Sequence, residues 1–315
     1  MTEFNDQPAP TGMLRVLTLD GGGAKGFYTL GVLKEIEAMD KNPLHKRFDL
    51  VFGTSTGAII ASLIALGHSV DSILSLYRTH VPTVMSKGTA SARTRALRKL
   101  SAEVFADATF EQVKTGIGIV SVKWQIERPM IFKASVAQAH GRTGTFVPGF
   151  GVSIADAVEA SCSAYPFFKR KIVRTFMGED IELIDGGYCA NNPTLYAIAD
   201  AIHALRYEHK KIRIVNIGVG TYPDPKPSWV MRLAKKFCVS VRLLPKILEI
   251  NTQSMDQLRH ILFKDISTIR ISDTFVQPDM ATDLFEHDLK KLDMLFQRGR
   301  ESFASREKDL REYLT

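Results

Sequence analysis

"LRVLTLDGGGAKGFYTLGVLKEIE", residues 14–37, joins an apolar run to an amphipathic segment through three consecutive glycines. The apolar run predicts a buried strand, and the three- and four-residue spacing of apolar residues in "YTLGVLKEIE" predicts a helix. Gly21, Gly23 and Gly26 also satisfy the pattern G-x-G-x-x-G, which binds dinucleotide phosphates when it lies between a strand and a helix. The stretch therefore poses a choice between a phosphate-binding loop and a loop with another purpose.

A second informative stretch, "FDLVFGTSTGAIIASLIALG", occupies residues 48–67. It holds the pattern G-x-S-x-G with Ser55 at its centre, and the pattern lies between a predicted strand and a predicted buried helix. That context is typical of a nucleophile elbow, in which the serine stands on a sharp turn. The start of the following helix favours negative charge that develops beside Ser55. Ser55 is therefore the candidate nucleophile.

A serine nucleophile needs a base, and Asp185 is the best candidate for it. Asp185 follows the predicted strand "IELI", so it stands at a strand end, where the active sites of such sheets form. The two glycines after it leave room for the serine and the carboxylate to approach. The histidines after the elbow fit poorly, because they lie in or beside predicted helices: His203, His209, His260 and His287.

The glycine-rich loop fits an oxyanion hole better than a cofactor site. Asp20 places a carboxylate directly before the loop, where it would repel a pyrophosphate. The next strand carries its acid, Asp49, at its start, whereas a dinucleotide fingerprint has an acid at that strand's end. A P-loop fails as well, since Lys25 is followed by glycine instead of serine or threonine. Backbone N–H groups of such a loop can instead stabilise a tetrahedral oxyanion.

Strands that alternate with helices predict an α/β fold with a mostly parallel central sheet. The pattern becomes largely helical after the proline-rich "YPDPKPS", which follows Thr221. We therefore expect a disordered leader at 1–12, a hydrolase domain at 13–225 and a helical C-terminal region at 226–315. That last region is expected to pack on the hydrolase domain or to regulate it.

The composition restricts the cellular setting. The three cysteines show no C-x-x-C spacing, so neither a disulfide framework nor a zinc site is expected, and a cytoplasmic protein fits. The longest apolar stretch, residues 58–67, is too short to span a membrane, and the N-terminus does not resemble a signal peptide. The net charge of +7 favours an anionic partner, although it can serve solubility alone.

Two basic segments are candidates for contact with an anionic membrane. Residues 228–248, "SWVMRLAKKFCVSVRLLPKIL", mix large apolar residues with five basic ones, and residues 87–99 carry basic residues without an acid. A basic amphipathic helix can lie on a membrane surface. It can equally dock on the sheet and leave a solvated basic rim, and both interpretations stay open here.

The motifs "DGGGAKG", "GTSTG", "ASCSAYPFF" and "DGG", in this order over residues 14–221, resemble those of the patatin-like phospholipases. The resemblance implies a three-layer α/β fold and hydrolysis of glycerophospholipid acyl esters without a metal or a catalytic cofactor. It makes Ser55 the nucleophile and Asp185 its partner in a dyad. Gly21, Gly22 and Gly23 would form the oxyanion hole, and Lys25 takes the place of the family's usual Arg or Lys.

The leader, the length and the tail at 249–275 are also similar to bacterial anti-phage (CBASS-type) effector phospholipases. This narrower resemblance implies activation by a cyclic dinucleotide, such as cyclic GMP-AMP, and degradation of the cell's own membrane from its cytoplasmic face. The resting enzyme would be occluded. Arg259, Lys264 and Arg270 are candidate nucleotide contacts, or else ordinary solvated charges. A phospholipid surface and a second copy of the chain are the expected partners, and nucleic acid is not.

Three alternatives remain at this stage. The first is an unregulated housekeeping lipase or esterase of the same family. The second is a nucleotide-binding module in which residues 21–26 hold phosphate and Ser55 is dispensable. The third is a membrane scaffold without activity, against which the intact hydrolytic motifs argue.

Overall fold

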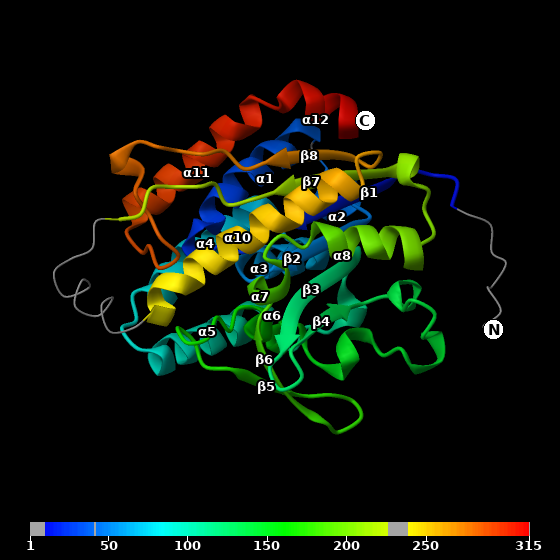
Figure 1. The fold of residues 1–315 in the computed structure, drawn as a ribbon, viewed down its shortest axis with the longest axis horizontal. Helices are drawn as coiled ribbons and strands as arrows, with labels where there is room; N and C mark the ends of the chain where they lie inside the picture. The colour runs from blue at the N-terminus through cyan, green and yellow to red at the C-terminus, as the bar shows by residue number, and fades with distance from the viewer. Residues whose placement is uncertain (1–9, 41, 226–238, 315) are drawn as a thin grey trace.

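The computed structural model describes residues 10–40, 42–225 and 239–314. Its centre is a mixed, mostly parallel sheet with the strand order β5-β6-β3-β2-β1-β7-β8 (Figure 1). The parallel strands are β1 (Leu14–Leu19), β2 (Leu50–Thr54), β3 (Gly116–Lys123), β7 (Ile212–Ile217) and β8 (Ser267–Ile271). The antiparallel strands are β4 (Arg128–Lys133), β5 (Lys171–Arg174) and β6 (Asp180–Asp185). The predicted α/β class is confirmed.

Helices cover both faces of the sheet and give three layers (Figure 1). Alternate residues of β1 point to opposite faces, so Leu17 and Leu19 pack in one apolar cluster while Leu14 and Val16 pack in the other. The described helices are α1 (Gly26–Asp40), α2 (Leu44–Arg47), α3 (Thr56–Leu66), α4 (Val70–Met85), α5 (Ala90–Phe105), α6 (Ile154–Ser161), α7 (Gly187–Ala190), α8 (Thr194–Ala199), α10 (Val239–Leu262), α11 (Leu289–Ala304) and α12 (Glu307–Leu314).

Helix α3 is the buried helix that the sequence predicts behind the serine. Its residues from Thr56 to Ala65 are all buried, because apolar or small side chains cover every side of it. It ends where Gly67 adopts a left-handed conformation with φ 94°, a common end for a helix. Burial on all sides gives α3 a fixed position, and its first residue therefore holds the serine turn in place.

The C-terminal region is part of the same sheet and the same core. The sequence predicts a largely helical region there, but residues 267–271 form β8, which pairs in parallel with β7. Helix α11 lies so close to α1 that a Cβ on Gly31 would stand 2.0 Å from the Phe296 carbonyl oxygen. Only glycine permits this approach of the two helices. A domain boundary near residue 225 stays a prediction, and residues 1–9 of the expected leader lie outside the described residues.

Candidate active site

Ser55 stands on a strained turn between β2 and α3. Its backbone has φ 54° and ψ −122°, a conformation that a residue with a side chain rarely adopts. The Ser55 N–H donates to the Ser161 hydroxyl at 2.9 Å, and this hydroxyl donates to the Val120 carbonyl at 2.6 Å. A Cβ on Gly57 would lie 2.3 Å from the Leu19 carbonyl oxygen, so this position requires glycine. Together these features give the sharp strand–helix turn that the G-x-S-x-G pattern predicts, and Ser55 stays the candidate nucleophile.

The sheet brings Asp185 to Ser55. Strand β4 occupies one edge of β3, so β2 and β6 share the other edge. On that edge Val120 pairs with Thr54 of β2, and the next residue, Ser121, pairs with Asp185 of β6. Strand β6 therefore begins to pair where β2 ends, and the residue after Thr54 meets Asp185. The Ser55 hydroxyl donates to Asp185 Oδ2 at 2.8 Å.

Asp185 has the environment of a base that works near neutral pH. Asp185 is buried, and this burial raises the pKa of its carboxyl from 3.8 to about 7. Hydrogen bonds from the Gly187 N–H and the Ser55 hydroxyl act in the opposite direction and lower the pKa in part. The Gly187 N–H donates to Asp185 Oδ1 at 2.7 Å and so fixes the carboxylate plane. Groups with a pKa near the working pH are the most effective general bases. The carboxylate can therefore accept the proton of the serine hydroxyl.

Two residues of the glycine loop line the same cavity as Ser55 and keep N–H groups without an acceptor among the described residues. The Gly21 N–H donates to the Asn191 carbonyl at 2.9 Å, and the Lys25 N–H donates to the Gly22 carbonyl at 3.2 Å. Among the described residues, the N–H groups of Gly22 and Gly23 have no acceptor, and both glycines line a cavity together with Ser55. Of the four residues predicted for an oxyanion hole, Gly22 and Gly23 are thus the two with free amides.

Lys25, two residues after Gly23, does not line this cavity. Burial lowers the pKa of its ammonium group, while the carboxylates of Glu249, Asp283 and Asp224 act in the opposite direction. Its backbone ends the short turn of the loop instead of pointing an N–H into the cavity. Lys25 therefore offers the cavity no free amide.

The cavity above the dyad is small and apolar. Its volume is about 60 Å³, and Thr56, Leu248 of α10 and Cys162 lie in its wall. The other apolar side chains of the wall are Ile59, Val81, Val84, Met85, Leu97, Leu100, Ala164, Phe167, Phe168, Leu284 and Phe285. A space of this size holds only a few water molecules. The wall is therefore apolar on most sides, as an acyl chain requires.

The basic residues proposed as nucleotide contacts lie in two different settings. Arg270 donates to Asp20 Oδ2 at 2.9 Å, and Arg259 donates to Asp256 Oδ1 at 3.0 Å, so both guanidinium groups have acidic partners. Lys264 is exposed. The expectation that Asp20 repels an anion at the loop is wrong in its premise, because Arg270 compensates the Asp20 charge. The Gly21 N–H is bound to the Asn191 carbonyl, so this N–H is not available to an anion.

The two basic segments differ in what the structure describes. Residues 226–238 lie outside the described residues, and of the remaining predicted amphipathic segment Leu244 is buried while Leu243 is exposed. The segment at 87–99 forms most of α5. There Arg98 pairs with Glu159 at 3.2 Å and Arg93 stacks on the Phe285 ring at 4.6 Å. Part of the basic charge of α5 therefore serves internal contacts.

The sequence predicts no catalytic histidine, no metal site and no membrane-spanning helix, and each can be looked for in the described residues. All eight histidines lie in these ranges, and none of them lines the cavity. Residues 10–40, 42–225 and 239–314 contain no group of three or more histidine, cysteine, aspartate or glutamate side chains that could hold a metal ion. In the same part of the chain, no helix has both the length and the apolar character that a membrane crossing requires.

Sequence reasoning missed two residues that support the site. Ser161 lies within the quoted "ASCSAYPFF" motif, which is the only signal that could have found it. Asn191 binds Gly21 on both sides, since its carbonyl accepts the Gly21 N–H and its side-chain amide donates to the Gly21 carbonyl at 3.1 Å. It belongs to no pattern that names such a contact, because the two residues are brought together only by the sheet.

A parallel α/β sheet with a serine on a strained strand–helix turn is the architecture of an acyl hydrolase. The sequence profile of patatin-like phospholipases matches residues 17–198, more than half of the chain. The chain therefore belongs to the patatin-like phospholipase family. The family and the fold expected from the motifs are confirmed, and the nucleotide-binding module is not favoured.

Similar proteins include two bacterial phospholipases. The chain is 68% identical over 314 residues to a cUMP-AMP-activated phospholipase of Escherichia coli. The alignment covers 100% of this chain and 97% of that protein. It is 27% identical over 233 residues to a cGAMP-activated phospholipase of Escherichia coli strain TW11681. That alignment covers 65% of this chain and 62% of that protein. Among solved structures, VipD from Legionella pneumophila aligns with a TM-score of 0.48 and 14% identity, over 97% of this chain and 68% of VipD.

Proposed function

We propose that this phospholipase hydrolyses acyl esters of membrane glycerophospholipids with a Ser55–Asp185 dyad. The observation that carries the proposal is the 2.8 Å hydrogen bond from the Ser55 hydroxyl to the buried Asp185 carboxylate. Gly22 and Gly23 line the same cavity, and their N–H groups have no acceptor among the described residues. Nucleophile, base and oxyanion donors are the three parts that acyl transfer by a serine requires. No metal ion or catalytic cofactor is needed for these steps.

In the acylation step, Ser55 Oγ attacks the ester carbonyl carbon and its proton moves to Asp185 Oδ2. The carbonyl oxygen becomes an oxyanion, and the N–H groups of Gly22 and Gly23 stabilise it. Collapse of this intermediate breaks the bond to the lysophospholipid oxygen, which takes the proton from Asp185. The acyl group then remains on Ser55 as an ester.

Deacylation repeats the sequence with water. Asp185 accepts a proton from the water molecule as it attacks the acyl carbon, and the same two N–H groups stabilise the second oxyanion. Collapse returns the proton from Asp185 to Ser55 Oγ and releases a fatty acid. One carboxylate thus acts as base and then as acid in each half-reaction, and a pKa of about 7 suits both roles.

We further propose that a cyclic dinucleotide activates the enzyme in anti-phage defence. The relative with 68% identity is named for activation by cUMP-AMP, and a second relative is named for activation by cGAMP. Leu248 of α10 lies in the cavity wall, so a ligand that shifts this helix would change the space open to an acyl chain. Cyclic UMP-AMP is therefore the first activator to test, and cyclic GMP-AMP the second.

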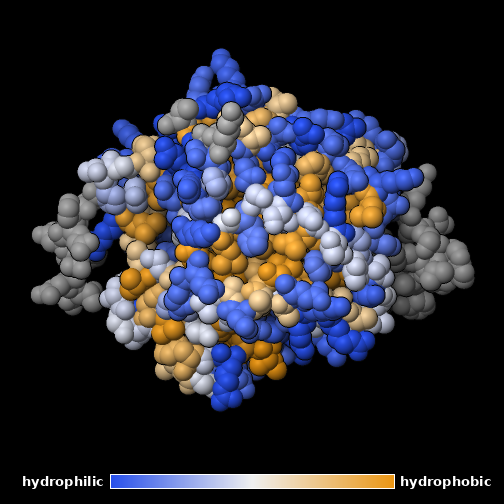
Figure 2. Space-filling model, turned by 180° about the vertical axis from the view of Figure 1, so that it is seen from behind, coloured by the Kyte–Doolittle hydropathy of each residue, from blue (hydrophilic) through white to orange (hydrophobic). Residues whose placement is uncertain are grey.

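The proposed substrate is the phospholipid of the cytoplasmic membrane face. Figure 2 shows hydrophobic residues exposed within one otherwise mostly hydrophilic face of the molecule. Trp124 and Tyr165 are each 40% exposed, and the Arg170 guanidinium lies over both rings. Tyr165 lies two residues after Ser163, whose carbonyl accepts the Asp185 N–H. Half-exposed aromatic rings beside a basic group suit a membrane–water interface. A homodimer stays a prediction.

The test is release of fatty acid from phospholipid vesicles, with cUMP-AMP, with cGAMP and without a nucleotide. We expect hydrolysis in the presence of cUMP-AMP, and none with S55A. The matched control is S62A, because Ser62 is a buried serine two turns further along α3 whose hydroxyl has no partner among the described residues. Full activity of S55A contradicts the dyad. Equal activity with and without both nucleotides contradicts activation and leaves the hydrolase proposal intact.

A further inference from the structure

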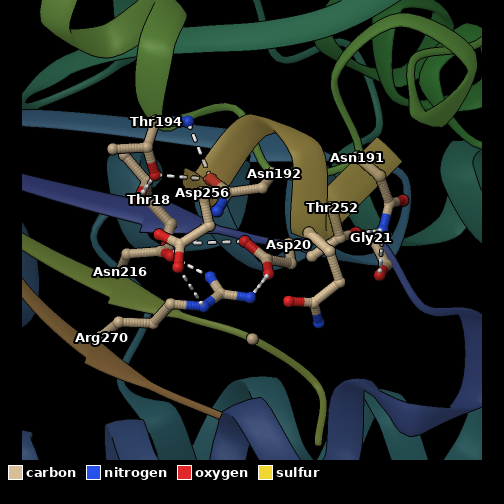
Figure 3. Close-up of polar contacts among 12 residues, drawn as sticks. Thr18, Asp20, Gly21, Asn191, Asn192, Thr194, Asn216, Thr252, Asp256 and Arg270 are labelled. Carbon is tan, nitrogen blue, oxygen red and sulfur yellow. Dashed lines mark hydrogen bonds and ion pairs between the residues drawn. The ribbon is translucent and has the colours of Figure 1, made fainter. Parts of the chain in front are cut away.

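A buried ion pair adjoins the glycine loop. Asp20 directly precedes Gly21, and its side chain is only 2% exposed. Figure 3 shows Arg270 reaching from β8 toward this carboxylate. Arg270 Nη2 donates to Asp20 Oδ2 at 2.9 Å, while Asn216 Nδ2 donates to Asp20 Oδ1 at 2.9 Å. Both carboxylate oxygens are therefore held, and so is the backbone two residues before the Gly22 N–H.

The same arginine connects the loop to helix α10. Arg270 Nε lies 3.8 Å from Asp256 Oδ2 of this helix (Figure 3). The other Asp256 oxygen accepts from Arg259 at 3.0 Å. One turn earlier on α10, the Thr252 hydroxyl accepts from Asn191 Nδ2 at 2.7 Å. That amide group also donates to the Gly21 carbonyl. Helix α10 thus reaches the loop by two routes.

Stability alone is a weak reason for such a pair. Removing charged groups from water is unfavourable, and a buried ion pair is often no more stable than an apolar pair of the same volume. What the pair does provide is a fixed position for the Asp20–Gly21 peptide. Position matters here, because oxyanion donors act only at about 2.7–3.1 Å from the developing charge, and a displacement of about 1 Å can reduce a rate about 100-fold.

We propose that Arg270 is a positioning residue: it fixes the oxyanion loop through Asp20 and links that loop to helix α10 through Asp256. The proposal rests on the proposed role of Gly22 and Gly23 as oxyanion donors. Because Leu248 of α10 lies in the cavity wall, one helix contacts both the acyl space and the oxyanion loop. A shift of α10 would therefore change substrate access and transition-state stabilisation together.

The test compares R270Q and R270K with the unaltered chain on phospholipid vesicles at saturating cUMP-AMP. Glutamine removes the charge and leaves Asp20 unpaired. Lysine keeps the charge, but its single ammonium group cannot reproduce the fork that reaches Asp20, Asn216 and Asp256. We expect kcat to fall about 100-fold in R270Q and at least fivefold in R270K, with KM within twofold of the unaltered chain. Each variant is assayed at a temperature about 15 °C or more below its measured Tm, so that the enzyme is folded in every assay.

The control is K133Q, which breaks another buried ion pair with similar exposure, between Lys133 and Asp200. We expect K133Q to lower Tm and to leave kcat within twofold, because this pair does not contact the loop. A kcat within twofold of the unaltered chain in R270Q overturns the proposal. If R270Q does not fold, the same limit is applied to R270K. A lack of hydrolysis by the unaltered chain would instead contradict the proposed function, so the two failures are distinguishable.

Discussion

The replacement of Asp185 by asparagine is expected to remove activity and yet to stabilise the fold above neutral pH. Burial raises the pKa of the Asp185 carboxyl from 3.8 to about 7. The folded state therefore holds this proton more tightly than the unfolded state does. Such a group stabilises the fold fully below pH 3.8, and this contribution is lost as the pH rises to about 7. Above that pH the buried, ionised carboxylate destabilises the folded state, and asparagine carries no such charge.

The magnitude follows from the shift. About three pKa units at 1.36 kcal/mol each correspond to about 4 kcal/mol at pH 8. At pH 5 most of this destabilisation is absent, because the carboxyl is largely protonated in the folded state. The unfolding free energy therefore differs by about 2 to 3 kcal/mol between the two pH values. Asparagine keeps both contacts, since its oxygen can accept from the Gly187 N–H and its NH₂ group can donate to Ser55 Oγ. We therefore expect D185N to gain stability chiefly through the lost charge.

The assay is urea unfolding of D185N and of the unaltered chain at pH 5 and pH 8. The matched control is D200N, because Asp200 is equally buried but is paired with Lys133 and His140. We expect D200N to be destabilised at both pH values, since it leaves Lys133 without its carboxylate partner. A gain for D185N that is the same at pH 5 and pH 8, or a loss at pH 8, would refute the reasoning.

Four further expectations follow from the site. Because Asp185 must be ionised to accept the serine proton, kcat/KM should fall about tenfold per pH unit below about pH 7, and a rate that is level from pH 5 to 7 would argue against this base. G22A should reduce kcat about 100-fold, because its Cβ would lie 2.6 Å from Val219 Cγ2, whereas the control G12A, with no atom within 4 Å, should be unaffected. S161A should reduce kcat roughly tenfold, since the Ser55 N–H loses its acceptor; an unchanged kcat would mean that the turn holds without it. EDTA should leave vesicle hydrolysis unchanged, and a loss that added Ca²⁺ restores would contradict the metal-independent mechanism.

The membership of a fold class and the candidate nucleophile can be predicted from local patterns. The periodicity of residues 14–37 and 48–67 predicts each strand, turn and helix, because an apolar face repeats with the period of the element it belongs to. The glycines around Ser55 likewise predict a sharp turn, since such a turn leaves no room for side chains. Strand β8 escaped prediction because its residues are only partly apolar and it lies at the edge of the sheet.

Contacts between distant residues are what the tertiary structure alone decided. Asp20 and Arg270 are 250 residues apart, and nothing in their surroundings predicts that they pair. The pair reversed the meaning of Asp20, from a charge that repels an anion to a compensated anchor for the loop. In the same way, only the register of β3 with β2 and β6 explains why Asp185 meets Ser55.

The glycine loop shows the division most clearly. Its sequence determined that backbone N–H groups would stand at the start of a helix and favour negative charge, because that follows from glycine and from helix geometry. Which of those N–H groups have no acceptor among the described residues was decided by distant carbonyls: Asn191 accepts from Gly21 and Leu284 accepts from Ala24. Gly22 and Gly23, which line the cavity with Ser55, are left without one. Hydrogen bonds of this kind form between segments that only the folded sheet brings together, and a local pattern holds no information about them.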